Sequence, residues 1–371
     1  MHDSLGITTV EDVDLAAVDV PAAGSQTSKQ VAGAPAAPID RLVLAAARAQ
    51  AGELSRLAAE STTALAAALA SRGAGADEAV VQLAARCVPR WHFAMLNDTE
   101  RNDALAVAVE RLVRPGMHVL DIGAGTGLLA MMAARAGAGR VTSCEANPLL
   151  AEIARQLVAA NGMSDVVDVV AGRSTDLMVG RELARPADLI VSEIVDCGLV
   201  GEGLLPTIRH ARHGLLTPGG QVMPQAARLF GFLIESPVII GLNRVTQASG
   251  FDVRLLNATS TSGHFPVRLS TWPHRELTPA VDLAAFDLAT GHLGDGSVVV
   301  RMPVTHDGTA QALVVWFELD LGAGITIRNS PDNLQSHWMQ ALVPLPADRP
   351  VTADTTVELR LTWHGERLYA G

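Results

Sequence analysis

The spacing of apolar residues divides the chain into helical and strand-like regions. In residues 39–70, leucine, isoleucine and valine recur at roughly helical spacing among many alanines, and residues 77–87 form a second helical pattern with Asp77 as its N-cap. Residues 357–364 instead alternate strictly between apolar and polar side chains, which is the period of a half-buried antiparallel strand. We therefore expect a helical layer near the amino terminus and an antiparallel sheet near the carboxyl terminus.

The middle of the chain alternates short apolar runs with helical segments. Val119, Leu120 and Ile122 suit a buried parallel strand, a helix is expected over residues 128–135, and the next strand ends at Glu145. The same alternation continues with a helix over residues 148–160 and strands over residues 166–171 and 188–193. Repeated alternation of strand and helix predicts an α/β fold with a doubly wound parallel sheet.

A glycine-rich loop joins the first of these strands to its helix. Gly123, Gly125 and Gly127 let the backbone approach a ligand closely. The spacing is Gly-x-Gly-x-Gly, and Leu128 stands where the Gly-x-Gly-x-x-Gly loop that binds a pyrophosphate has its third glycine, so a dinucleotide is the less expected ligand. Glu145 ends the next strand, about 20 residues past the loop, where an acid can hydrogen-bond ribose hydroxyls. A tight turn without a ligand is the alternative for the loop taken alone.

Two further segments concentrate polar residues suited to a site. Arg101 lies in WHFAMLNDTERND, residues 91–103, ahead of a helix expected over residues 104–113. The simpler alternative for Arg101 is an ion pair with a nearby acid on a solvated helix face. Glu193 and Glu202 flank a glycine-rich loop after the fourth strand. Taken alone, Glu193 could end a strand and Glu202 could cap the next helix, but ligands bind at the carboxyl ends of parallel strands.

The composition changes from helical to strand-like after Gly219, Gly220 and Pro224. The expected strands cover residues 229–235, 297–304, 313–320 and 357–364. The second domain is therefore mostly β, and residues 245–270, which are less regular, form a candidate projecting arm. In SHWMQ, residues 336–340, a histidine and a tryptophan precede a strand, where a buried tryptophan beside a hydrogen-bonded histidine is the simpler interpretation.

The composition indicates an acidic, soluble protein of two domains, because 371 residues with 49% hydrophobic content can bury a full core. The formal net charge of −11 disfavours nucleic-acid binding, which needs clustered basic residues. No apolar run reaches the length of a membrane helix, and acids near the amino terminus argue against a secretory signal, so we expect a cytoplasmic protein. Three cysteines without a CxxC pair and eleven scattered histidines predict no metal site. One lysine, Lys29, among 28 basic residues indicates the coding bias of a GC-rich bacterial genome.

Four motifs follow one another along the chain: MLNDTERND, VLDIGAGTG, SEIVDCGLVGEG and SHWMQ. From about residue 91 to residue 371, they resemble the cofactor-covering segment, cofactor motif, double-glutamate loop and Thr-His-Trp loop of the protein arginine methyltransferase family. The resemblance implies an S-adenosylmethionine cofactor and an arginine or arginine-containing acceptor. The cofactor contacts that it implies come from Arg101, Asp121, Gly123, Gly125, Gly127, Glu145, Ser174 and Thr175. The active-site residues that it implies are Glu193 and Glu202, which clamp the guanidinium, with Met95, His337 and Trp338.

This resemblance also implies a domain plan. A Rossmann-like methyltransferase domain is expected at residues 91–224 and an antiparallel, β-barrel-like substrate and dimerisation domain at residues 225–371. They follow a flexible tail over residues 1–38 and a helical extension over residues 39–90, which falls outside the resemblance. The expected assembly is a homodimer.

The double-glutamate loop, with its aspartate and GEG ending, and HWMQ look most like the type III branch, which adds a single methyl group. The chain departs from the family in lacking a tyrosine-rich helix before the cofactor segment, since its one tyrosine is Tyr369, and in having one catalytic module. We expect an arginine N-methyltransferase acting on free L-arginine, with protein arginine as the alternative acceptor. An NAD-dependent dehydrogenase and a non-catalytic cofactor-binding protein are more distant alternatives.

Overall fold

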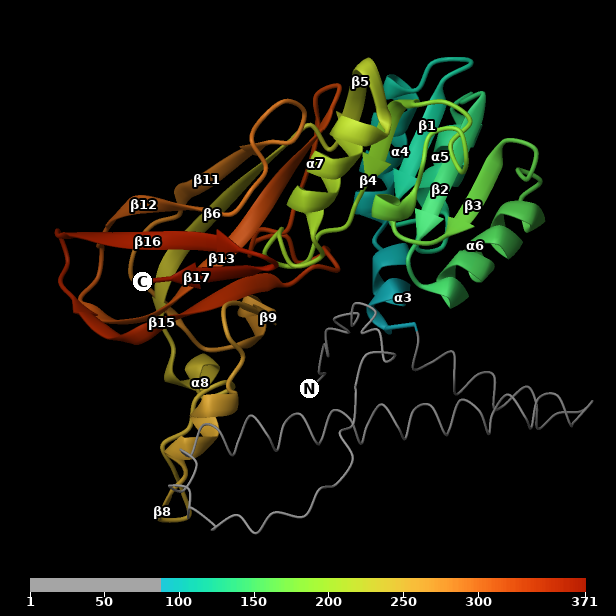
Figure 1. Cartoon of the computed structure of the whole chain (residues 1–371). Coiled ribbons are helices and arrows are strands. Elements are labelled where there is room, and N and C mark those ends of the chain that lie inside the picture. Colours follow the sequence, from blue (N-terminus) through green and yellow to red (C-terminus); the bar gives the residue numbers. More distant parts are fainter. Residues whose placement is uncertain (1–87) are drawn as a thin grey trace, which may run out of the picture. The chain divides into compact units, whose positions relative to one another are not determined.

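Five parallel strands form the sheet on which the predicted cofactor loop stands. The structure is a computed structural model that describes residues 88–371, so the predicted tail and the helical patterns of residues 39–70 and 77–87 lie outside the described residues. The strand order is β3-β2-β1-β4-β5 (Figure 1). The strands are β1 (His118–Ile122), β2 (Arg140–Glu145), β3 (Val167–Ala171), β4 (Ala187–Ser192) and β5 (Leu216–Met223). The order reverses between β1 and β4, which brings the loops that follow these two strands together.

Side chains cap two of the five helices that the structure describes in this region at their starts, and these two are α4 (Thr99–Leu112) and α6 (Pro148–Ala160). The other three are α3 (Trp91–Leu96), α5 (Leu128–Arg135) and α7 (Leu204–Gly214). The predictions for α5 and α6 are confirmed to the residue, and α6 starts where the Asn147 side chain accepts hydrogen bonds from two backbone amides. Helix α4 begins earlier than the predicted residue 104, because Asp98 caps it by accepting from the Arg101 amide.

Strand β5 contains Gly219 and Gly220, two of the residues at which the sequence predicts a change from helical to strand-like composition. It pairs in parallel with β4, and the register shifts near Gly219, which has a left-handed φ of 78°. A Cβ on Gly220 would lie 2.7 Å from Leu216 Cδ1 and 3.0 Å from the Asp188 carbonyl oxygen, so a side chain would not fit. The glycines therefore accommodate a bulge in the last strand rather than mark its absence.

Antiparallel strands build the rest of the described chain, as the alternating pattern predicts. The larger sheet contains β6 (Ala226–Glu235), β9 (Phe265–Val267), β10 (Arg275–Glu276), β11 (Val281–Asp287), β13 (Gly308–Gly322), β14 (Ile325–Arg328) and β15 (Gln340–Val351). The smaller sheet contains β12 (Gly296–Pro303), β16 (Thr356–His364) and β17 (Arg367–Ala370). All four predicted strands are confirmed. Strand β13 is central because its apolar residues are buried on both faces, with Phe317 fully enclosed.

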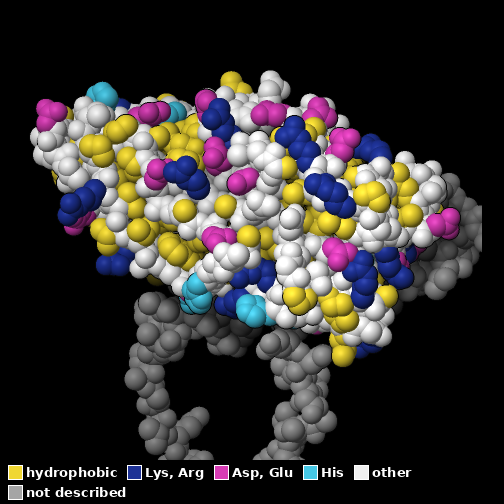
Figure 2. All heavy atoms as spheres, turned by 90° about the horizontal axis from the view of Figure 1, so that it is seen from above, with side chains coloured by type: hydrophobic (Ala, Val, Ile, Leu, Met, Phe, Trp, Pro, Cys, Tyr) yellow, Lys and Arg dark blue, Asp and Glu magenta, His cyan; other side chains and the backbone are white. Residues whose placement is uncertain are grey.

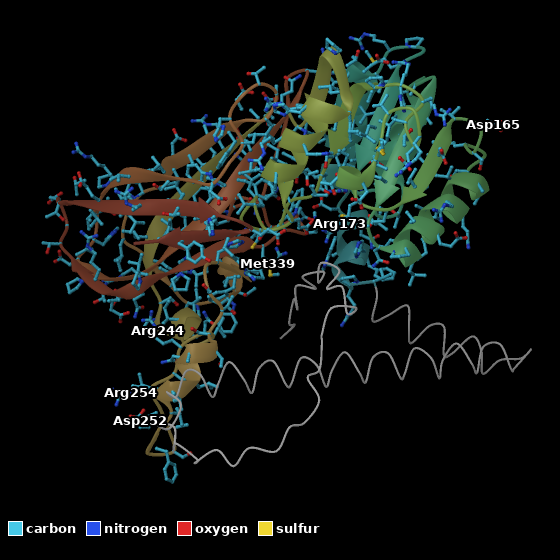
Figure 3. All side chains as sticks on the ribbon, viewed as in Figure 1. Asp165, Arg173, Arg244, Asp252, Arg254 and Met339 are labelled. Carbon is cyan, nitrogen blue, oxygen red and sulfur yellow. The ribbon has the colours of Figure 1, made fainter. Side chains whose placement is uncertain are left out.

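The segment expected as an arm, residues 245–270, divides into a projecting part and a buried part. Figure 1 shows the projecting part, which contains β7 (Gln247–Ala248), β8 (Phe251–Asp252) and η3 (Arg254–Thr259). Figure 3 labels Asp252 and Arg254 there, which form an ion pair of 2.6 Å. The prediction is wrong for the last residues, because Val267 pairs with β15 and Leu269 is buried in an apolar cluster beneath the larger sheet.

The surface carries both signs of charge. On the face drawn in Figure 2, arginine side chains and acidic side chains are interspersed with apolar ones. Within residues 88–371, no helix combines the length and the apolar character needed to cross a membrane.

Candidate active site

The glycine loop after β1 is held against the end of β2. Glu145 Oε2 accepts a hydrogen bond of 2.8 Å from the Gly125 amide, and its Oε1 accepts one of 2.8 Å from the Asn147 amide. Gly123 has a left-handed φ of 82°, and a Cβ there would lie 2.4 Å from Ile194 Cγ2. Gly125 has a left-handed φ of 52°, but a Cβ there would meet nothing within 4 Å. The loop therefore packs tightly beneath and faces open space above, as a backbone cradle for a ligand does.

Other predicted cofactor residues stand at different depths around this loop. Asp121 is fully buried and accepts a hydrogen bond of 2.7 Å from Ser143 Oγ, so its side chain is not open to solvent. The pKa of Asp121 is raised to about 7, mainly by burial, and the charge of Glu145 acts in the same direction. Ser174 and Thr175 begin the short 3₁₀ helix η2 (Ser174–Asp176) after β3, where Ser174 is buried and Thr175 is exposed. An acid, backbone amides and hydroxyls at this edge fit a ligand with ribose hydroxyls.

Arg101 and Glu193 form a buried, bidentate ion pair. Arg101 Nε donates to Glu193 Oε1 at 3.1 Å, and a terminal nitrogen of Arg101 donates to Oε2 at 2.6 Å. Their side chains are 5% and 7% exposed, and the Arg101 guanidinium also lies 5.8 Å from the centre of the Trp338 ring. The alternative of a solvated helix-face pair is therefore wrong, because the partner comes from the distant loop after β4. The pair therefore connects Arg101, a predicted cofactor contact, with Glu193, a predicted acceptor contact.

Asp98 is a site residue that the sequence analysis missed. Its Oδ1 accepts from the Arg101 amide at 3.0 Å, and its Oδ2 accepts from the His337 amide at 2.8 Å and lies 2.9 Å from His337 Nδ1. These hydrogen bonds outweigh the opposing effect of burial and hold the pKa of Asp98 below its usual range, whereas burial lowers the pKa of His337. An aspartate just before a helix was the available signal, but its partner lies 239 residues away.

Trp338 ties the loop before β15 to the double-glutamate loop. Its Nε1 donates to the Val195 carbonyl at 3.2 Å, and its ring meets Phe317 edge to face with ring centres 5.2 Å apart. Ser336 Oγ accepts from the Trp338 amide at 3.2 Å. A buried tryptophan beside a hydrogen-bonded histidine is thus what the structure contains, and the contacts place both next to Glu193. Met95, the remaining predicted residue, is half-buried on α3.

Unlike Glu193, which pairs with Arg101, Glu202 forms no ion pair with a basic side chain within residues 88–371. Desolvation and then the charge of Glu193 raise its pKa to about 8, although its surface remains open to solvent. The side chain is therefore crowded by protein yet accessible to a ligand. Glu202 does not cap α7, because the N-cap position is occupied by Gly203 and no side chain caps this helix. An accessible carboxyl group beside the buried Arg101–Glu193 pair can receive a cation once it ionises.

Comparison with known proteins gives two family matches. Residues 226–368 match the arginine methyltransferase oligomerization subdomain. Residues 104–213 match the ribosomal protein L11 methyltransferase model.

Among relatives, an arginine N(omega)-methyltransferase from Streptomyces achromogenes subsp. streptozoticus is 56% identical over 323 residues, covering 87% of this chain and 89% of the relative. Protein arginine N-methyltransferase 7 from Aedes aegypti is 33% identical over 307 residues, covering 70% of this chain but 45% of that protein. The chain thus spans less than half the length of the second relative.

Solved structures share the fold. The Trypanosoma brucei PRMT1 enzyme-prozyme complex with AdoHcy aligns with a TM-score of 0.64 and 25% identity, covering 75% of this chain and 90% of that one. Protein arginine methyltransferase 10 from Arabidopsis thaliana aligns with a TM-score of 0.59 and 22% identity, covering 73% and 86% of the two chains.

Proposed function

Because the chain belongs to the arginine methyltransferase family, we propose that it transfers one methyl group to a terminal guanidino nitrogen of free L-arginine. It is an S-adenosylmethionine-dependent arginine N-methyltransferase, and the observation that carries this conclusion is the 56% identity to the Streptomyces enzyme over nearly all of that enzyme's length. The dehydrogenase and the non-catalytic binding protein are thereby set aside. The single methyl group, the free amino acid and the residue roles below are the proposal.

The edge of the parallel sheet supplies the cofactor contacts in this proposal. Glu145 would accept hydrogen bonds from the ribose, the loop at Gly123 and Gly125 would pass beneath the amino-acid end, and Arg101 would meet the cofactor carboxylate. The bound cofactor supplies an electrophilic methyl group on its sulfonium. Arg101 is already held by Glu193 through two hydrogen bonds, so its guanidinium is fixed before any ligand enters.

The two glutamates balance the charge of an incoming guanidinium. With Arg101 beside them, ionised Glu193 and Glu202 leave one net negative charge, which matches one cationic acceptor. Charge-assisted hydrogen bonds from the acceptor to these carboxylates draw positive charge away from the nitrogen that attacks the methyl group. Holding that nitrogen in line would supply roughly 7 to 11 kcal/mol of the barrier reduction. The attacking nitrogen must lose a proton, and Glu202, with a pKa of about 8, is a suitable first acceptor.

Charged groups beside Glu202 support a small acceptor. Glu366, in the turn between β16 and β17, places Oε1 3.4 Å from where a Cβ on Gly203 would stand, and its charge raises the pKa of Glu202. Arg367 follows it and donates to the His264 carbonyl at 3.2 Å. An acid and a base at one edge suit the α-ammonium and α-carboxylate of a free amino acid, whereas a peptide has neither group at that position. The name of the Streptomyces relative specifies arginine without protein.

Competition between acceptors tests the substrate. Free L-arginine and an arginine-glycine-rich peptide, mixed with the enzyme and cofactor, should give a kcat/KM ratio that favours the free amino acid, because a peptide lacks the α-ammonium and α-carboxylate that Glu366 and Arg367 would pair. Mass spectrometry after exhaustive reaction should find monomethylarginine. A ratio favouring the peptide would assign the enzyme to protein arginine, and a dimethylated product would contradict the single transfer.

A homodimer is part of the proposal. The match of residues 226–368 to an oligomerization subdomain supports association. The projecting segment exposes Phe251, Leu255 and Leu256, which are 74%, 62% and 60% accessible and suit a protein contact. We also propose a bacterial enzyme that works in the cytoplasm, and the Streptomyces relative supports the bacterial source.

A further inference from the structure

Asp196 lies inside the double-glutamate loop, three residues after Glu193 and six before Glu202, and contacts a residue from the other end of the fold. Its Oδ2 lies 2.5 Å from His264 Nε2, and its Oδ1 accepts from the amides of Gly198 and Gly201 at 3.0 and 2.9 Å. The carboxylate thus folds the loop between the two glutamates around itself. His264 is 2% exposed and stands where the projecting segment returns to β9.

The hydrogen bonds of His264 fix its proton. Its Nδ1 accepts from the Leu368 amide at 3.0 Å, and a backbone amide can only donate. The ring is therefore neutral, its proton lies on Nε2, and that nitrogen donates to Asp196. Hydrogen bonds from His264 and the loop amides hold the pKa of Asp196 below its usual range against the opposing effect of burial. One imidazole thus links the carboxyl-terminal strand β17 to the double-glutamate loop.

The loop cannot relax around this link without cost. Leu199, which is fully buried, has a left-handed φ of 77°, a conformation that surrounding contacts must maintain in a residue other than glycine. A Cβ on Gly198 would lie 2.8 Å from His264 Nε2, and one on Gly201 would lie 2.2 Å from Asp196 Oδ2. Glycines at these two positions let the backbone wrap the pair closely. If Asp196 moved away, the Gly198 and Gly201 amides would lose the acceptor that holds this strained turn in place.

We propose that His264 is a positioning residue that, through Asp196, sets the spacing and direction of Glu193 and Glu202 for the acceptor guanidinium. The inference rests on the proposed function of these two glutamates. Glu193 has a second support in Arg101, whereas Glu202 forms no ion pair with a basic side chain within residues 88–371. The His264–Asp196 link therefore acts most strongly on Glu202.

A bound metal ion is the competing explanation for this cluster. Asp196, Cys197 and His264 bring three donor atoms within 4.8 Å of one another among the described residues. However, both oxygens of Asp196 and both ring nitrogens of His264 already have hydrogen-bond partners. Burial raises the pKa of the Cys197 thiol well above its usual range, so the thiolate that a metal needs is disfavoured. One equivalent of metal in the purified enzyme would overturn the hydrogen-bonded link.

Two substitutions separate the link from the packing of the ring. In His264→Gln the side-chain amide can still donate to Asp196 from the place of Nε2, whereas in His264→Asn the side-chain oxygen can still accept from Leu368 in the place of Nδ1. We expect His264→Asn to lower kcat/KM for L-arginine about tenfold or more, the effect of losing a hydrogen bond to a charged group. His264→Gln should stay within about threefold of the parent enzyme, and cofactor affinity should be unchanged in both.

A purely structural role would lower activity in the two variants in parallel with their melting temperatures. Equal losses in both variants, or normal turnover in His264→Asn, would overturn the proposal. If His264→Asn does not fold, Asp196→Asn carries the same expectation, because its amide cannot both accept from the loop and receive the proton of His264. Glu202→Gln is measured alongside. Normal turnover there would refute the proposed function, whereas loss there with normal His264→Asn would refute only the positioning role.

Discussion

The cofactor side and the acceptor side of the site are assembled in different ways. Most of the cofactor side comes from one stretch, residues 117–147, in which Glu145 and the Cys144 carbonyl bind the amides of the adjacent glycine loop. The acceptor side joins four distant segments, carrying Asp98, the double-glutamate loop, His264 and Trp338. Local hydrogen bonds shape the first, and contacts spanning tens to hundreds of residues shape the second.

This difference teaches that affinity for the cofactor and alignment of the acceptor can change separately. The cofactor loop keeps its form through its own βαβ unit, so distant substitutions should leave cofactor affinity intact. The acceptor loop depends on the antiparallel sheets, so changes there should act on methyl transfer. Arg101 is the exception, because its ion pair with Glu193 connects both sides.

The largest expected effect is on the acceptor side. Glu202→Gln keeps the shape of the side chain but removes its charge, so kcat should fall by about two orders of magnitude or more while calorimetry finds unchanged cofactor affinity. Glu358→Gln, which alters an exposed acid on β16, is the matched control and should behave as the parent enzyme. Near-normal turnover in Glu202→Gln, or an equal loss of cofactor affinity, would break the distinction between the two sides.

The next effect is on the cofactor side. Glu145→Ala removes the proposed ribose contact and the bond to the Gly125 amide, so cofactor affinity should fall roughly ten- to 150-fold, as expected for losing about 1.5 to 3 kcal/mol. At saturating cofactor, the KM for arginine should stay close to that of the parent. Calorimetry measures the affinity, with Asp165→Ala, an exposed acid after α6, as control (Figure 3). Unchanged affinity in Glu145→Ala would remove this residue from the cofactor site.

The same contrast explains what the sequence could predict. Helices α5 and α6 were predicted to the residue because a glycine loop, a capping asparagine and a proline mark their starts locally. The Arg101–Glu193 pair was missed because neither residue carries a mark of its partner in the chain.

Asp98 and His264 were missed for the same reason. Each is an ordinary polar residue in sequence, and each becomes a site residue only when the fold brings it to a partner 239 or 68 positions away. Strand β5 was missed because Gly219 and Gly220 conceal a bulged strand that the neighbouring β4 stabilises. Family motifs identified the glutamates themselves, but no local pattern could reveal what supports them.

The smallest expected effect is a dependence of acceptor capture on pH. The pKa of Glu202 is raised to about 8, and the guanidinium of the acceptor stays charged to pH 12, so capture should strengthen as Glu202 ionises. At saturating cofactor, kcat/KM should rise about tenfold between pH 7 and pH 9. Asp121, whose pKa is raised to about 7, lies on the cofactor side, and saturation with cofactor limits its contribution. 5-Guanidinovalerate serves as acceptor, because it lacks the α-amino group that would titrate in the same range.

Stability gives this prediction an independent control. Burial raises the pKa of folded Glu202 above the unfolded value of 4.5, so its ionisation costs stability, which is lost progressively as pH rises from about 4.5 to about 8. Glu202→Gln cannot ionise at this position. The difference in melting temperature between this variant and the parent should therefore increase in favour of the variant from about pH 4.5 to about pH 8 and stay constant at higher pH. The residual activity of Glu202→Gln should also lose the rise with pH. If the variant keeps the rise, another group governs acceptor capture, and the crowded setting of Glu202 shapes the fold without controlling the reaction.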